Sequence, residues 1–239
     1  MQQMHLPTMT KANKIIVITL FVAFLLDAVL KKTTGISLTG ITGLQAASLE
    51  SGFVWQLVTY PLVPGSMFEI LFEALIFWFI GSELEQLWGV KKYLRFLFAC
   101  LVGGTILYVL STSIFLRSTV AYQMVLSGPG GISSAVAVAY GILFPERTMY
   151  FFMFPLKAKW FVAIIVGMSL YQGIFSPFGL FSWCQLGNIG SGYMWMLMQT
   201  RGKFKIPGIG SLKSGKTKSV KKSHLSIVKD DDDNDITYH

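Results

Sequence analysis

Residues 94–116 read LRFLFACLVGGTILYVLSTSIFL, a run of 23 residues in which Arg95 is the one charged side chain. As an α-helix this run extends about 35 Å at 1.5 Å per residue, which is enough to cross a hydrocarbon core of about 30 Å. We therefore interpret it as a membrane-spanning helix.

The composition of the chain extends this interpretation to the rest of the body. Charged residues make up 13% of the 239 positions, about half the share found in an ordinary soluble domain. Fourteen of the charged residues lie in residues 201–239, so the remainder is poorer still. The net charge of +8 is then a signal of topology rather than of nucleic-acid binding. We expect an all-α, polytopic protein whose first partner is the lipid bilayer, with no nucleic acid bound.

Five further apolar stretches bring the number of predicted spans to six. Several of them are only 16 or 17 residues long, and short spans are typical of helices that begin inside the bilayer beside a cavity. A loop over residues 33–65, rich in Thr, Gly and Ser, separates the first two spans. The five stretches are residues 15–30, 67–82, 128–144, 160–175 and 185–200.

The basic residues predict the orientation of these spans. If the N-terminus is inside, seventeen of the twenty Lys and Arg residues lie on the cytoplasmic side, and only Lys31, Lys32 and Arg117 lie on the other. We expect both termini to be cytoplasmic and the membrane to be a bacterial inner membrane. The expected parts are a cytoplasmic segment at 1–13, a six-helix membrane domain at 14–200 and a disordered, basic then acidic, cytoplasmic tail at 201–239.

Two carboxylates in the second predicted span are unusual. Glu69 and Glu73 are spaced i,i+4, so they share one face of a helix, and charge inside a membrane usually faces a cavity or a partner. One interpretation is a hydrated pocket that binds a cation, a proton or the basic group of a partner. The other is that Glu69 lies near the outer interface, while Glu73 stays protonated and hydrogen-bonded within the bundle.

Three stretches of the body match one family of membrane proteins. Residues 53–62 read FVWQLVTYPL, residues 72–89 read FEALIFWFIGSELEQLWG, and GPGGI at 128–132 is followed by QLGNIGSG at 185–192. Together they resemble the Trp-Arg-Leu-Leu-Thr-Tyr-Pro, Gly-x-x-Leu-Glu-x-x-x-Gly, Gly-x-Ser-Gly and His-Leu-Gly-Gly motifs of rhomboid intramembrane serine proteases. The resemblance covers residues 13–200 and implies a six-helix rhomboid-like bundle with a long first loop.

The resemblance also implies where a catalytic site would lie. Rhomboid chemistry needs a serine nucleophile, a histidine base and donors for the oxyanion. Carried over by position, Gly130 stands at the nucleophile and Gln185 at the base. Glu69 and Glu73 stand at the histidine and asparagine that help to form the oxyanion hole. Every catalytic position is therefore degenerate, and we expect no catalytic residue.

The residues themselves favour the same conclusion. The three histidines, His5, His224 and His239, all lie in the terminal segments, where none can serve as a base within the membrane. Ser133 and Ser134 are expected to pack rather than to react, and Cys184 is expected to be an inert buried thiol. We expect no cofactor and no metal.

The leading hypothesis is a rhomboid-like pseudoprotease, a membrane scaffold that binds the transmembrane segment of a client protein. The family resemblance alone would imply a serine-type endopeptidase, and a protease that works with atypical residues is the alternative. A small transport module that uses the membrane carboxylates is the second alternative. The candidate client-binding residues are Trp55, Glu69, Glu73, Gly130 and Gln185.

Overall fold

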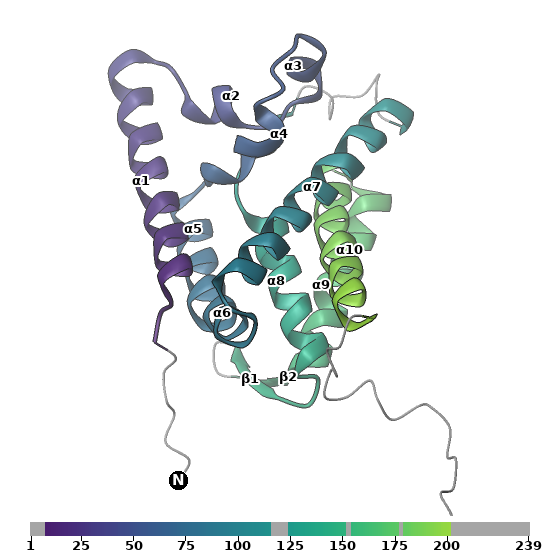
Figure 1. Ribbon diagram of the computed structural model, residues 1–239. Coiled ribbons are helices and arrows are strands. Elements are labelled where there is room, and N and C mark those ends of the chain that lie inside the picture. The colour runs from purple at the N-terminus through teal and green to yellow at the C-terminus, as the bar shows by residue number, and fades with distance from the viewer. Residues whose placement is uncertain (1–7, 116–123, 152–153, 177–178, 202–239) are drawn as a thin grey trace, which may run out of the picture.

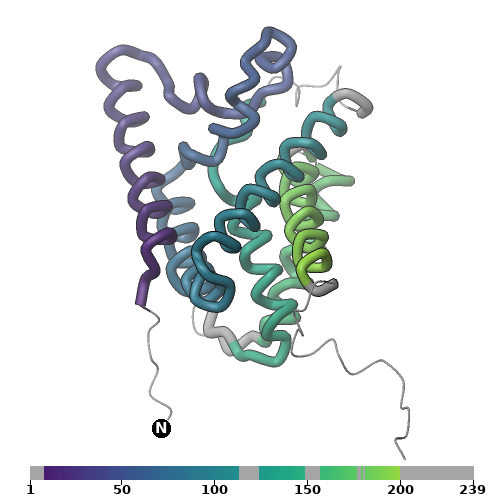
Figure 2. The backbone as a smooth tube through the Cα atoms, in the orientation of Figure 1, coloured from purple at the N-terminus to yellow at the C-terminus, as the bar shows by residue number. Residues whose placement is uncertain are grey.

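The computed structural model describes residues 8–115, 124–151, 154–176 and 179–201, and the statements below refer to these ranges. Residues 1–7 of the predicted N-terminal segment, and the predicted tail beyond Arg201, lie outside these ranges. Figure 1 shows a helical bundle, and Figure 2 traces the same path through the Cα atoms. The long segments are α1 (Lys11–Thr34), α5 (Met67–Leu75) continued by the π-helical turn η2 (Ile76–Gly81) and by α6 (Ser82–Trp88), α7 (Val90–Phe115), α8 (Gly130–Leu143), α9 (Ala158–Phe175) and α10 (Gly179–Arg201).

Each of the six predicted spans coincides with one of these segments, and the all-α, polytopic class is confirmed. By length and apolar composition, three described helices can cross a membrane: α1, α7 and α9. A fourth span is counted if residues 56–62 and 67–88, which meet at a bend of 90°, are taken together. The helix α8 is apolar but shorter, at 14 residues. The total of six crossings therefore stays a prediction.

The loop between α1 and α5 folds over one end of the bundle, which we call the loop end (Figure 1). It contains α2 (Leu38–Thr42), α3 (Ala46–Glu50), α4 (Gln56–Thr59) and the 3-10 turn η1 (Tyr60–Leu62). The buried Gln56 holds the loop together, because its Oε1 accepts from the amide of Gln45 and its Nε2 donates to the carbonyl of Ile41, both at 3.3 Å. This amide thus has a structural role at the position where the rhomboid motif has arginine.

Helices α7 and α10 pack against each other along much of their length, and glycines allow their close approach. A Cβ placed on Gly187 would lie 2.6 Å from the carbonyl oxygen of Gly103 and 2.9 Å from the Cα of Gly104. Such distances show that the two backbones touch, as small residues permit in membrane helices. Helix α8 is buried along most of its length against α10, α9 and η2, so its first turn is held in a defined place.

The opposite end, which we call the hairpin end, holds the start of α1, the end of α10 and a small β-hairpin (Figure 1). Strands β1 (Thr148–Phe151) and β2 (Phe154–Lys157) pair antiparallel in the connection between α8 and α9, for which the sequence analysis predicted no strand. Next to them, the ammonium groups of Lys159 and Lys157 hold the pKa of Glu146 below its ordinary value.

A buried polar network at the hairpin end joins α1 to α6 and α7. The Glu85 carboxylate accepts from the amides of Ala12 and Asn13 and from Asn13 Nδ2, the last at 2.8 Å. It also accepts from the Thr10 hydroxyl, and Tyr93 donates to Asn13 Oδ1 at 2.7 Å. Glu85 therefore caps the N-terminus of α1, where the helix leaves amide groups unpaired.

Candidate functional site

The structure brings four of the five predicted site positions to one place, where α5 and α10 meet the first turn of α8. Gly130 begins α8, and a Cβ placed on it would lie 3.5 Å from Glu73 Oε1 on α5. Gln185 reaches the same turn from α10, because its Nε2 donates to Ser134 Oγ at 2.7 Å. Glu69 lies one turn before Glu73 on α5. The degenerate positions are thus spatial neighbours.

Trp55, the fifth position, lies elsewhere. It precedes α4 in the loop, is 46% exposed, and its Nε1 donates to the carbonyl of Ile41 at 3.2 Å. Its ring packs on Phe53 with 4.9 Å between the ring centroids. These contacts are within the loop, so Trp55 belongs to the surface of the loop end rather than to the group around Gly130.

The two serines that follow Gly130 are turned back onto the helix. Ser133 Oγ donates to the carbonyl of Gly130 at 3.1 Å, and Ser134 Oγ donates to the same carbonyl at 2.7 Å. Ser134 Oγ also receives the amide hydrogen of Gln185. A serine nucleophile needs a neighbouring base that takes its proton, whereas the Gln185 amide group gives one. The arrangement around Ser134 is therefore a hydrogen-bonded link between α8 and α10.

The thiol of Cys184 has no base beside it in the described structure. Its sulfur lies 3.8 Å from the hydroxyl of Tyr60 and 3.7 Å from Asn188 Nδ2, and the residue is buried. Both neighbours are weak acids or donors, and a reactive cysteine needs a group that favours the thiolate. The geometry fits the inert thiol that the sequence analysis expected.

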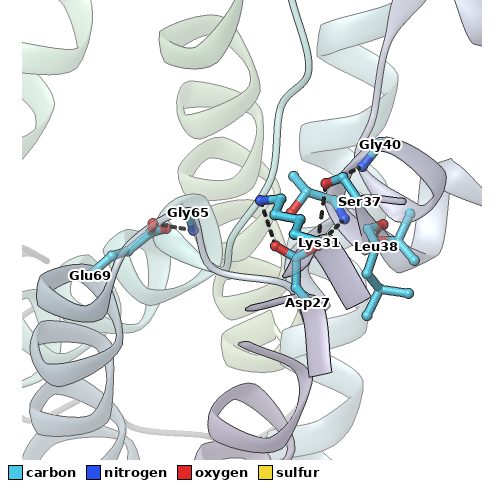
Figure 3. Close-up of polar contacts among 9 residues, drawn as sticks. Asp27, Lys31, Ser37, Leu38, Gly40, Gly65 and Glu69 are labelled. Carbon is cyan, nitrogen blue, oxygen red and sulfur yellow. Dashed lines mark hydrogen bonds and ion pairs between the residues drawn. The ribbon is translucent and has the colours of Figure 1, made fainter. Parts of the chain in front are cut away.

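Glu69 is held by the start of its own helix. Ser66 caps α5, its Oγ accepting from the amide of Glu69 at 3.2 Å. The Glu69 carboxylate turns back and accepts from the amide of Gly65 at 2.8 Å, as Figure 3 shows. This resembles a capping box, in which serine and glutamate satisfy amides at a helix start. The other oxygen lies against Gly128, whose φ of +90° and lack of a Cβ permit the contact.

Glu73 is the exception among the described carboxylates at this end. It is 4% exposed, and Ser133 lies close enough to interact with its carboxyl group. Its Oε2 has no hydrogen-bond partner in the part of the chain that the structure describes. A buried polar atom without a partner destabilises a fold, so such atoms are rare and usually have an explanation.

Sequence reasoning missed two contributors to this place. Asn188 is fully buried and packs on Gly131 and Gly104, and its Nδ2 donates to the carbonyl of Cys184 at 3.0 Å. Ser134 is the acceptor for Gln185 rather than a packing residue only. The spacing of Asn188, i+3 from Gln185, is the signal that could have placed it on the same face of α10.

The described residues around Gly130 do not form a set of metal ligands. Within residues 8–115, 124–151, 154–176 and 179–201, no three His, Cys, Asp or Glu side chains lie close enough together to hold a metal ion. What the site offers chemically is one buried carboxylate beside backbone glycines and an amide side chain.

Comparison with known proteins places the chain in a family. Residues 14–199 match the family described as "Eukaryotic integral membrane protein (DUF1751)". Rhomboid-like protein 19 of Arabidopsis thaliana is 27% identical over 128 residues, which are 52% of this chain and 41% of that protein. Rhomboid protease GlpG of Haemophilus influenzae is 30% identical over 138 residues, which are 56% of this chain and 61% of that protein.

Each alignment thus spans less than two thirds of the relative's length. The names of both relatives support the rhomboid-like resemblance that the motifs predicted. The description of the family as eukaryotic counts against the bacterial inner membrane that we expected. Since the match covers most of the chain, this protein belongs to the DUF1751 family of eukaryotic integral membrane proteins and is a rhomboid-like, multi-pass member.

Proposed function

We propose that this protein is a non-catalytic rhomboid-like scaffold that binds the transmembrane segment of a client protein. One observation carries the proposal: the positions of the rhomboid catalytic site are assembled in space but hold groups that cannot perform acyl transfer. Gly130 has no nucleophile, and the amide of Gln185 donates where a base would have to accept. A site that keeps the spatial arrangement of a rhomboid protease but lacks its nucleophile and base can still bind a transmembrane segment without cleaving it.

The surroundings of Gly130 are suited to contact with a helix in the membrane. Gly130, Gly131, Ser134 and Gln185 are all partly exposed, whereas the rest of α8 is largely buried. Helix α5 packs on α1, η2 and α8, and α9 packs on α8, α10 and β2. Helices α5 and α9 thus both pack on α8, and both carry exposed apolar side chains, such as Leu71 on α5 and Met168 on α9.

Proteolysis with atypical residues is less well supported. GlpG is named a protease, and that name describes the relative. In this chain Ser133 and Ser134 both donate to a backbone carbonyl, and no histidine lies among the described residues. Transport through the membrane carboxylates is also less well supported, because Glu69 is engaged in capping α5.

A fluorophosphonate probe, which labels serines activated for nucleophilic attack, separates the first two functions. We expect the purified full chain to show no more labelling than the Ser133→Ala, Ser134→Ala double variant. Labelling of the unmodified protein that disappears in the double variant would contradict the non-catalytic proposal. Cleavage of a model transmembrane substrate by the unmodified protein would contradict it as well.

The topology proposed from the charges has a separate test. The described start of α1 and end of α10 both lie at the hairpin end (Figure 1). We expect reporters fused after Lys14 and after Lys205 to be cytoplasmic, and one between Lys32 and Trp55 to be on the other side. A non-cytoplasmic reporter after Lys205 would contradict the six-span topology.

A further inference from the structure

The described carboxylates are almost all matched to a donor or a cation. Glu85 caps α1 and Glu69 accepts from the amide of Gly65. Three others form ion pairs: Asp27 with Lys31 at 2.7 Å, Glu83 with Arg147 at 2.7 Å, and Glu146 with Lys157 at 3.0 Å and Lys159 at 2.7 Å. Figure 3 shows the ion pair of Asp27 with Lys31. The Asp27 carboxylate also accepts from the amide of Thr39 and the hydroxyl of Ser37. Against this pattern Glu73, with an unpartnered oxygen, stands out.

Glu73 lies where an unpartnered carboxyl group is costly, inside the helix bundle. Its side chain is more than nine-tenths buried, in the second turn of α5, and faces the first turn of α8. Glu69, one turn away, adds negative potential. The four basic residues that form ion pairs in the described structure, Lys31, Arg147, Lys157 and Lys159, all pair with other carboxylates. A carboxylate inside a membrane bundle generally faces a partner or a pathway, and its partner is then to be sought outside the described residues.

We infer that Glu73 receives the basic side chain, Lys or Arg, of a client's transmembrane helix. This inference rests on the proposed function and specifies which clients the site selects. A lysine offers three N–H donors and an arginine five, on stems long enough to reach beyond the helix that carries them. Gly130 presents no side chain to obstruct the approach to Glu73, and it is partly exposed. A basic group within a client's span is itself costly in lipid, so pairing it with Glu73 relieves both partners.

A small metal cation fits the same place less well. Calcium takes six to eight oxygen ligands and magnesium six, and the described residues hold no group of three His, Cys, Asp or Glu side chains suited to a metal. Glu69 is also engaged with the amide of Gly65. One free carboxylate with partly exposed neighbours matches a single ammonium or guanidinium group better than a metal ion.

The test uses the purified full chain in lipid vesicles and two single-span peptides that differ at one position. The position lies at the depth of Glu73 and carries either Leu or Lys, and binding is followed by energy transfer from a donor dye on the protein to an acceptor dye on the peptide. We expect the Lys peptide to bind at least about tenfold more tightly, the size expected of a hydrogen bond to a charged group. Glu73→Gln should remove this difference, whereas Glu83→Gln, a matched change at the other end of the same span, should preserve it.

Reversing the charge at residue 73 should create a new binding preference, whereas Glu73→Gln only removes one. Glu73→Lys should bind a peptide with Glu at the test position more tightly than the Lys peptide. Equal affinities of the Leu and Lys peptides for the unmodified protein would overturn the inference while leaving the proposed function in place. Binding of neither peptide would count against the proposed function itself. Calcium or sodium binding without peptide, lost in Glu73→Gln, would replace the inference with a metal-cation site.

Discussion

The two ends of the span formed by α5, η2 and α6 each bury a glutamate, and they treat it in opposite ways. At the hairpin end Glu85 accepts from backbone amides, from Asn13 Nδ2 and from the Thr10 hydroxyl. At the loop end Glu73, equally buried at 4% exposure, has an oxygen with no partner in the described structure. A satisfied buried carboxylate organises a fold, whereas an unsatisfied one is a destabilising feature that a function can explain. The comparison separates Glu85, which stabilises the bundle, from Glu73, which we propose to bind a client.

The largest expected effect comes from removing the satisfied carboxylate. Glu85→Ala leaves two amides of α1, Asn13 Nδ2 and the Thr10 hydroxyl without their acceptor inside the bundle. We expect a loss of about 3 to 5 kcal/mol in the free energy of unfolding, measured by denaturant titration in micelles.

Glu83→Gln is the control for that variant, because the Glu83–Arg147 pair is partly exposed and such pairs contribute about 1 kcal/mol or less. Equal losses of stability for Glu85→Ala and Glu83→Gln would contradict the claim that the buried, hydrogen-bonded Glu85 stabilises the bundle.

The next effect concerns the catalytic residues that we propose the loop end lacks. Gly130→Ser with Gln185→His restores a dyad, and the Cβ at residue 130 would make an ordinary contact of 3.5 Å with Glu73 Oε1. We nevertheless expect no efficient protease, since Glu73 places a carboxylate oxygen where an oxyanion donor is needed. Losing one such donor typically costs about 2.7 to 4 kcal/mol, or two to three decades in rate.

Adding Glu69→His and Glu73→Asn to that pair of changes tests this explanation. The quadruple variant should cleave a model transmembrane substrate clearly faster than the double variant at neutral pH. Equal rates would remove the electrostatic argument.

A smaller effect is expected from one donor in the hairpin-end network. Tyr93→Phe removes the hydroxyl that donates to Asn13 Oδ1 at 2.7 Å and leaves that buried oxygen unsatisfied. We expect a loss of about 1 to 2 kcal/mol in the free energy of unfolding, in the same titration. Tyr171→Phe, at an exposed position on α9, is the matched control and should be neutral. A neutral Tyr93→Phe would show that the network stabilises less than its geometry implies.

The smallest change in stability should follow from Glu73→Gln. Because the Glu73 oxygen lacks a partner, replacing the carboxyl group by an amide of the same size breaks no described hydrogen bond of that oxygen. We expect the free energy of unfolding to stay within about 1 kcal/mol of the unmodified value, or to rise. A loss as large as that of Glu85→Ala would mean that Glu73 has a structural role.

The membrane helices and the candidate site positions were accessible from sequence for clear physical reasons. An apolar run such as residues 94–116 predicts a membrane span, because a helix that crosses the lipid must be apolar along its whole length. The positions of Gly130 and Gln185 followed from motifs in short segments, and in the structure both residues bond to Ser134.

The partners of the carboxylates were not accessible in the same way. By nearness in sequence alone, Lys91, Lys92 and Arg95 are the natural candidates for the partners of Glu83 and Glu85. In the structure Glu83 pairs with Arg147, and Glu85 bonds to Asn13, 72 residues earlier. Such pairing depends on which helix starts meet in space, which no local pattern encodes. The hairpin at 148–157 was missed because its strands are four residues long and Pro155 interrupts the run.

The central claim is that the place around Gly130 holds a transmembrane segment without cutting it, and site-specific crosslinking tests it most directly. A photoreactive side chain replaces Gln185, or in a matched variant the exposed Tyr193 on the same helix, and the full chain is mixed in vesicles with a defined single-span peptide. The account predicts a saturable adduct of the intact peptide from position 185 and little from position 193. Equal adducts from both positions, or recovery of a cleaved peptide, would contradict it.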